Sequence, residues 1–207
     1  MPSKSSELNV YLDLDRTLFR TDLFDKLRWQ LLAKWYPGKF DLAVESQRQS
    51  EFYEYRGELY FYNFMAHMTN LGIDLDEVFE KIRTSELADG RLEYSGVREL
   101  INWIRQRGEA RILTFGPNGY QSLKVSLCPS LRDVEVIITG EEKSKYFNSL
   151  TDKSSEIWMV DDKIIRDLPE NIHFVQANLE GVTVVKQGWS VIDKLGKIPG
   201  TIAKTAA

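Results

Sequence analysis

Hydrophobic and polar residues follow two different rhythms along the chain, and these predict two kinds of structure. Residues 8–14, Leu-Asn-Val-Tyr-Leu-Asp-Leu, form a short apolar run that is typical of a buried strand. From about 22 to 90 the apolar residues recur at helical spacing instead. One set at four-residue intervals shares a single helical face: Leu23, Leu27, Leu31 and Trp35. The pattern therefore predicts a helical segment directly after the first strand.

Helix-breaking residues divide the segment 22–90 into four predicted helices. Pro37-Gly38 ends the first helix, and Gly57 and Gly72 each end another. Asp74 is expected to cap the N-terminus of the last one. The three later helices are expected over 40–56, 58–71 and about 74–87.

Strands and helices alternate after Gly90, which favours a parallel sheet covered by helices on both faces. The expected helices are 96–107 and 119–126, and the expected strands are 110–114, 134–139, 156–161, 172–176 and 182–185. The chain thus predicts an α/β core built from 1–21 and 91–207. The segment 22–90 is then an inserted α-helical domain.

Composition and charge exclude several classes of protein. Of 207 residues, 43% are hydrophobic and 28% charged, which is ordinary for a globular protein and excludes a disordered one. There are 31 acidic and 27 basic residues, so no basic excess favours nucleic-acid binding. Apolar runs fall far short of the roughly 18 residues that a membrane span needs. No signal-peptide pattern is present and Cys128 is the single cysteine, so we expect a cytoplasmic protein without disulfides.

Polar and acidic side chains stand where three predicted strands end. Asp13 and Asp15 end the first, Thr114 ends the next, and Asp161-Asp162 ends a third. In a parallel sheet these groups converge at one edge, where the active site of such a sheet lies. Clustered carboxylates repel one another and need a cation, and oxygen ligands without His or Cys favour Mg²⁺. A divalent ion among carboxylates suits phosphoryl chemistry.

Residues 13–19, Asp-Leu-Asp-Arg-Thr-Leu-Phe, resemble the first motif of the haloacid dehalogenase-like (HAD) phosphohydrolase superfamily, Asp-x-Asp-x-Thr after an apolar strand. Residues 95–116 resemble its second-motif region, with Thr114 in the motif position. Val160-Asp161-Asp162 is similar to the acidic fourth motif. The resemblance spans about 8–185 and implies a Rossmann-like parallel sheet with a helical C1-type cap in the place of 22–90.

The resemblance also implies roles for these residues. Asp13 would be the nucleophile that forms an aspartyl-phosphate, and Asp15 would be the general acid and base. Thr114 would bind a phosphoryl oxygen. Asp161 would hold Mg²⁺ together with Asp13 and the backbone carbonyl of Asp15. Further candidates for binding phosphate or substrate are Thr17, Arg20, Arg56, Phe115 and Gly116.

The third motif of this superfamily is a lone lysine, and the sequence offers three. Lys143 precedes a predicted helix between the second and fourth motifs and is preferred, while Lys145 and Lys124 remain alternatives. Arg16 replaces the usual glycine of the first motif. No further acid follows Asp161-Asp162 at the usual spacing, so this pair must supply the acids of the fourth motif alone. The alternative interpretation of Asp161-Asp162 is that the pair caps a helix near 163–168.

The function that the resemblance implies is Mg²⁺-dependent hydrolysis of a small phosphomonoester. A phosphomutase, a nucleotidase and a non-catalytic protein on the same scaffold remain open. A dehalogenase is disfavoured. A halide leaves without needing a proton, so a dehalogenase needs no acid at position 15, yet Asp15 is present. The expected partner is a small phosphorylated metabolite, with neither nucleic acid nor membrane involved. The substrate itself and the oligomeric state stay open.

Overall fold

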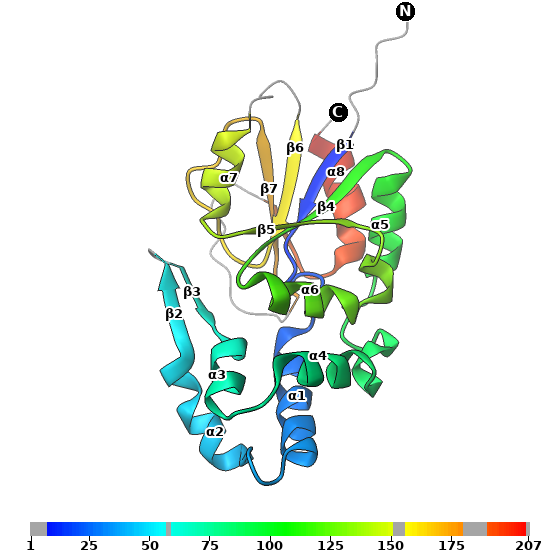
Figure 1. Ribbon diagram of the computed structural model, residues 1–207. Helices are drawn as coiled ribbons and strands as arrows, with labels where there is room; N and C mark the ends of the chain where they lie inside the picture. The colour runs from blue at the N-terminus through cyan, green and yellow to red at the C-terminus, as the bar shows by residue number, and fades with distance from the viewer. Residues whose placement is uncertain (1–7, 57–58, 151–155, 180–189, 206–207) are drawn as a thin grey trace, which may run out of the picture.

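A six-stranded parallel sheet forms the centre of the molecule, as the alternating pattern predicts (Figure 1). The computed structural model describes residues 8–56, 59–150, 156–179 and 190–205. The strand order is β5-β4-β1-β6-β7-β8. The strands are β1 (Leu8–Leu12), β4 (Gly108–Phe115), β5 (Glu135–Thr139), β6 (Ile157–Asp161), β7 (Ile172–Ala177) and β8 (Ser190–Ile192). The strand expected over 182–185 lies outside the described residues.

Helices cover the sheet on both faces, so the α/β prediction is confirmed. The helix α7 (Lys143–Ser149) covers one face, where Phe147 packs with Tyr11 and Met159. On the other face α5 (Val97–Arg105) and α8 (Ile198–Thr205) pack on Val10 and Val160. The central strands are apolar on both sides because each face is buried. The shorter connections contain η2 (Glu86–Asp89), η3 (Pro129–Leu131) and η4 (Leu195–Lys197).

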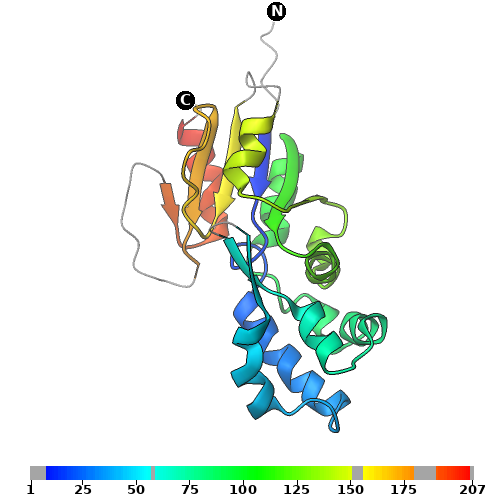
Figure 2. The same ribbon diagram turned by 60° about the vertical axis from the view of Figure 1, so that its left-hand side comes forward.

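The segment after β1 leaves the sheet and forms a second layer against the carboxyl ends of the strands (Figures 1 and 2). We call residues 22–90 the insert. Its helices are α1 (Thr21–Trp35), α2 (Leu42–Arg48), η1 (Gln49–Phe52), α3 (Phe64–Asn70) and α4 (Leu75–Arg83). It packs on the core helix α6 (Asn118–Ser126) through Tyr120, whose ring stacks on Phe64 at 5.1 Å. One buried apolar cluster therefore joins the insert to the core.

The prediction of continuous helices over 40–56 and 58–71 is wrong, because a β-hairpin lies between α2 and α3. Its strands are β2 (Tyr53–Arg56) and β3 (Leu59–Tyr62), which pair antiparallel. The sequence Tyr-Glu-Tyr-Arg alternates with period two, and the β-forming aromatic residues of Leu-Tyr-Phe-Tyr favour strand over helix. The insert is therefore helical with one two-stranded sheet.

No described helix combines the length and the apolar character that crossing a membrane requires.

Candidate active site

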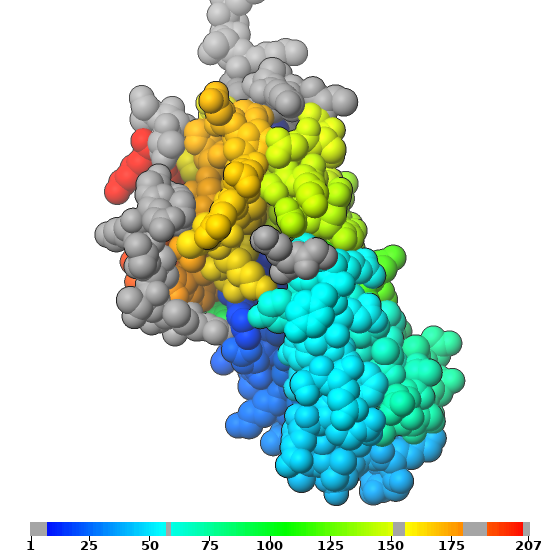
Figure 3. Space-filling model, turned by 90° about the vertical axis from the view of Figure 1, so that its left-hand side faces the viewer, coloured from blue at the N-terminus to red at the C-terminus, as the bar shows by residue number. Residues whose placement is uncertain are grey.

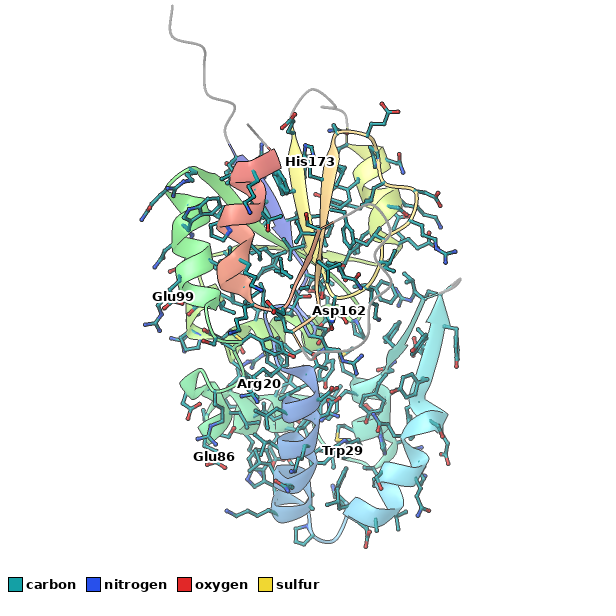
Figure 4. All side chains as sticks on the ribbon, turned by 180° about the vertical axis from the view of Figure 1, so that it is seen from behind. Arg20, Trp29, Glu86, Glu99, Asp162 and His173 are labelled. Atoms are coloured by element: carbon teal, nitrogen blue, oxygen red, sulfur yellow. The ribbon has the colours of Figure 1, made fainter. Side chains whose placement is uncertain are left out.

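Three neighbouring strands bring the predicted acids together at the edge of the sheet that faces the insert. Asp13 directly follows β1, Asp161 is the last residue of β6, and Thr114 is near the end of β4. Since β4, β1 and β6 are adjacent, the three side chains converge. All three are at least 95% buried. Figure 4 shows Asp162 at this edge, while His173 lies at the opposite end of the sheet.

Lys143 lies between two of these acids. Its Nζ donates hydrogen bonds to Oδ1 of Asp13 and, at 2.5 Å, to Oδ2 of Asp161. Lys145 lies elsewhere: its side chain is 61% exposed and its ammonium is 3.9 Å from Glu142. The structure thus places Lys143, and not Lys145, at the position that a charge-neutralising lysine requires.

Lys124 meets the other acid of the first motif. Its Nζ donates to both carboxylate oxygens of Asp15, at 2.7 and 2.9 Å. Gln121 donates to Oδ2 of Asp15 at 3.1 Å, and the hydroxyl of Thr21 donates to Oδ1 at 2.7 Å. Gln121 and Lys124 stand three residues apart on one face of α6, so helical spacing was the signal that would have identified Gln121.

The charges at the site give each acid a different proton affinity. Burial raises the pKa of Asp13 well above its ordinary value, and the opposing charge of Lys143 does not overcome this because Asp161 and Asp162 also raise it. Burial acts on Asp15 in the same direction, but the ammonium of Lys124 and the hydrogen bonds outweigh it. The pKa of Asp15 is therefore lowered.

Three carboxylates are arranged as a metal site would require. Oxygens of Asp13, Asp161 and Asp162 all lie within 4.8 Å of one another. Asp13 and Asp161 are buried and Asp162 is partly buried, and such a set of hard oxygen donors without His or Cys fits Mg²⁺. The helix considered near 163–168 is absent, so Asp162 caps none. Instead Asp161 accepts the backbone N–H of Lys163 at 2.8 Å, and Asp162 adds a carboxylate that the predicted ligand set lacked.

Binding of Mg²⁺ is expected to stabilise the protein more as the pH rises. Burial and Asp161 raise the pKa of Asp162 from 3.8 to about 7. A raised carboxyl pKa favours the folded state at low pH and loses that contribution as pH rises through about 7. The metal binds the deprotonated form. We therefore expect the rise in Tm caused by Mg²⁺ to grow between about pH 5 and about pH 8 in calorimetric scans.

The matched pair of variants for this experiment is Asp162→Asn and Asp167→Asn. Asp167 is an exposed acid with a positive φ of 57°, which Asn tolerates. The pH dependence should flatten in the first variant and persist in the second. An equal Mg²⁺ effect at both pH values in the unmodified protein would contradict the proposed ligand set.

Three of the residues predicted to bind phosphate, Thr114, Phe115 and Gly116, lie next to Gln121. Its Nε2 donates to Oγ1 of Thr114 at 3.2 Å and to the carbonyl of Phe115 at 2.6 Å. Gly116 has a φ of +141°, and a Cβ there would lie 2.9 Å from Nε2 of Gln121, so a larger residue would strain the backbone and displace the Gln121 amide. Oγ1 of Thr17 is buried and has no hydrogen-bond partner among the described residues, which leaves it free to bind a ligand oxygen.

The two predicted arginines lie in different places. Arg20 is exposed, and its guanidinium is 3.5 Å from the carbonyl of Arg91, where the insert returns to the core. The structure does not bring Arg20 to the carboxylates. Arg56 lies beside the end of the edge strand β5, where its Nη1 is 3.4 Å from the position that a Cβ on Gly140 would occupy.

Solved structures of other proteins share the fold of this chain. The chain is similar to a protein from Burkholderia xenovorans LB400 described as a haloacid dehalogenase-like hydrolase, with a TM-score of 0.71, 13% identity, and 97% of this chain and 99% of that one covered. It is also similar to magnesium-bound YfnB of Bacillus subtilis, a protein described as a HAD-hydrolase (TM-score 0.56, 14% identity, 95% and 98% covered). A third is CbbY of Rhodobacter sphaeroides in complex with xylulose-(1,5)bisphosphate (TM-score 0.58, 12% identity, 94% and 99% covered). No protein-family model and no curated protein matches the chain.

Proposed function

The chain has the fold of the HAD-like hydrolases, and from this fold and its acid cluster we propose that it is a Mg²⁺-dependent phosphatase acting on a small phosphomonoester. The observation that carries the proposal is the position of Asp13. It stands at the end of a central strand, paired with Lys143, and its oxygens adjoin those of Asp161 and Asp162. A carboxylate so placed suits attack on a phosphorus atom whose charge must be neutralised.

The first step transfers the phosphoryl group to the protein. An oxygen of Asp13 forms a bond to phosphorus as the ester P–O bond breaks, which gives an aspartyl-phosphate and an alcohol. The phosphoryl oxygens would be held by the ammonium of Lys143 and by the hydroxyls of Thr114 and Thr17. Asp13, Asp161 and the added acid Asp162 would hold Mg²⁺, which supplies further neutralisation of the transferring group.

Asp15 would supply and recover the proton. In the first step its carboxyl group would protonate the leaving oxygen, and in the second its carboxylate would take a proton from the water that attacks phosphorus. The ion pair with Lys124 favours the carboxylate form, which is the one that the second step needs. The proton that Asp15 donates in the first step would come from the monoanionic phosphate group of the bound substrate. Lys124 is thus proposed to tune Asp15, while Lys143 acts at the phosphoryl group.

Replacing Lys124 with Met should raise the pKa of Asp15, because burial would remain while the neighbouring positive charge is lost. Loss of a close opposite charge shifts a carboxyl pKa by about one to three units. Carbon-13 NMR titration of the Asp15 carboxyl group in metal-free protein measures this directly. Lys145→Met is the control and should leave the pKa unchanged. An unaltered Asp15 titration in Lys124→Met would refute the tuning role.

Phosphate release from a panel of substrates tests the proposed activity. The panel contains a generic aryl phosphate, sugar phosphates, nucleotides and phospho-amino acids, each with Mg²⁺ and with a chelator. We expect Mg²⁺-dependent release of phosphate from at least one compound, and recovery of free phosphate rather than an isomerised sugar phosphate separates a phosphatase from a phosphomutase. Release at full rate in chelator, or none from any compound, would exclude the proposal.

A further inference from the structure

One face of the hairpin is made entirely of tyrosines. The register pairs Tyr53 with Tyr62 and Tyr55 with Tyr60, and paired residues of an antiparallel ladder point to the same side. We call these four residues the tyrosine face. Their rings form a continuous series, with centroids 5.9 to 6.0 Å apart between Tyr53 and Tyr60, Tyr53 and Tyr62, and Tyr55 and Tyr60.

The opposite face of the hairpin is fixed to the core. Phe61 meets Phe115 edge-on at 5.6 Å, next to Thr114 of the candidate site. Arg56 lies over the ring of Phe61 and reaches Gly140 after β5. Figure 3 shows the hairpin region, in cyan, lying against the core atoms coloured yellow-green and yellow. The hairpin is therefore held beside the strand ends that carry the acids, which fixes where the tyrosine face lies.

The tyrosine face borders the acid cluster through one cationic residue, Lys163. The ammonium of Lys163 is 6.0 Å from the ring centroid of Tyr60, and the backbone N–H of the same lysine binds Asp161. The loop after β6, which carries Asp162, thus also supplies a cation beside the Tyr60 ring.

The outer end of the face is exposed and the inner end is anchored. The exposed fractions of Tyr55 and Tyr60 are 74% and 58%, which is high for large aromatic residues. Tyr62, in contrast, shares a hydrogen bond of 2.6 Å with His67, whose other ring nitrogen is 2.7 Å from Glu45. The guanidinium of Arg28 lies 5.4 Å from the Tyr62 ring. The buried network fixes the inner ring while the outer rings remain open to a ligand.

We propose that the tyrosine face binds the leaving group of the substrate, and that this group carries a planar aromatic ring. The inference rests on the proposed phosphatase function and names its substrate class. Lys163 connects the two places, because its backbone N–H binds Asp161 and its ammonium lies beside the Tyr60 ring. Aromatic rings stack on tyrosine regardless of their substituents, so both a phenolic ester and a nucleoside monophosphate have the required chemistry. The flanking Lys163 complements the negative charge of either compound.

Binding of non-hydrolysable phosphonates tests the inference without turnover. Phenylphosphonate and cyclohexylphosphonate have similar size, but only the first is planar and aromatic. With Mg²⁺ present, calorimetry should show phenylphosphonate binding about tenfold more tightly, the size expected of one stacking contact. An adenine-bearing alkylphosphonate forms the second arm. Preference for it over phenylphosphonate would identify a nucleotide as the substrate, and the reverse preference a phenolic ester.

Two variants of one exposed residue show whether the tyrosine face makes this contact. Tyr60→Leu should abolish the preference for the aromatic phosphonates, whereas Tyr60→Phe keeps the ring and should retain it. Cyclohexylphosphonate should bind all three proteins equally, which also shows that they are folded. Equal affinity for the phenyl and cyclohexyl compounds in the unmodified protein would overturn the inference, as would no binding of either.

Failure of the inference and failure of the proposed function give different results. The protein could hydrolyse alkyl and aromatic phosphates with equal kcat/KM, and Tyr60→Leu could leave both values unchanged. That result would reject the aromatic leaving group but retain the proposed phosphatase activity. Stacking-dependent binding without release of phosphate from any ester would retain the tyrosine face as an aromatic binding surface and reject the phosphatase.

Discussion

Asp13→Asn should lower the rate of phosphate release by about four orders of magnitude or more, the size of loss found when a covalent nucleophile is removed. The amide is nearly isosteric with the carboxylate but is a poor nucleophile, so no aspartyl-phosphate would form. The substitution also removes one oxygen ligand of the proposed Mg²⁺ site. Both effects act on the chemical step and not on the fold, because Asp13 is buried in a polar cluster that Asn also fits.

The control for this experiment is Asp133→Asn, which alters an exposed acid before β5. We expect its kcat and KM to equal those of the unmodified protein. Circular dichroism should show both variants folded, with Asp13→Asn at least as stable as the unmodified protein at neutral pH, since an uncharged side chain relieves repulsion from Asp161 and Asp162. Substantial residual activity in purified Asp13→Asn would assign the nucleophile elsewhere.

Lys143→Met should have the second largest effect, a loss of about 10² to 10³ in kcat, comparable to removing one group that stabilises a developing charge. The ammonium of Lys143 contacts both Asp13 and Asp161. Without it the nucleophile would keep its proton to higher pH, because burial and the neighbouring acids already raise its pKa. The measurement is kcat for the best substrate of the panel, at saturating Mg²⁺.

Lys145→Met is the matched control, two residues away on the same short helix. Its side chain is largely exposed, and its ammonium pairs with Glu142 rather than with a site acid. Its removal should therefore change kcat less than about twofold. A larger loss in Lys145→Met than in Lys143→Met would transfer the phosphoryl-binding role to Lys145.

The arrangement of the acids could be predicted because it follows from topology. Asp13, Thr114 and Asp161 each stand at the end of an apolar run, and parallel strands bring such ends to one edge. The sequence favours Lys143 over Lys145 and Lys124, but the final choice among the lysines could not be made from the sequence alone. It depends on which residue of a helix points inward, and this is set by the start of α7 for Lys143 and by the packing of α6 for Lys124. The sequence offered both, and the structure assigns each to a different acid.

The hairpin of the insert was missed because its sequence also fits a helix. Phe61, Phe64, Met65 and Met68 share a helical face, which favoured one helix over 58–71. In the structure Asn63 separates the two elements and caps α3, accepting the N–H of Ala66 at 2.9 Å. Phe61 instead contacts the core residue Phe115, a tertiary contact that local periodicity cannot reveal. The hairpin, and with it the tyrosine face, therefore could not be predicted from the sequence pattern.

Trapping the phosphorylated protein tests the central claim most directly. The protein would be mixed with substrate and Mg²⁺, quenched rapidly in acid, reduced with borohydride and mapped by peptide mass spectrometry, since reduction converts an aspartyl-phosphate to homoserine. We predict homoserine at position 13, dependent on substrate and Mg²⁺, and absent from the Asp13→Asn variant. Steady release of phosphate with Asp13 unmodified at every quench time, or reduction at a different carboxylate, would contradict the proposed mechanism.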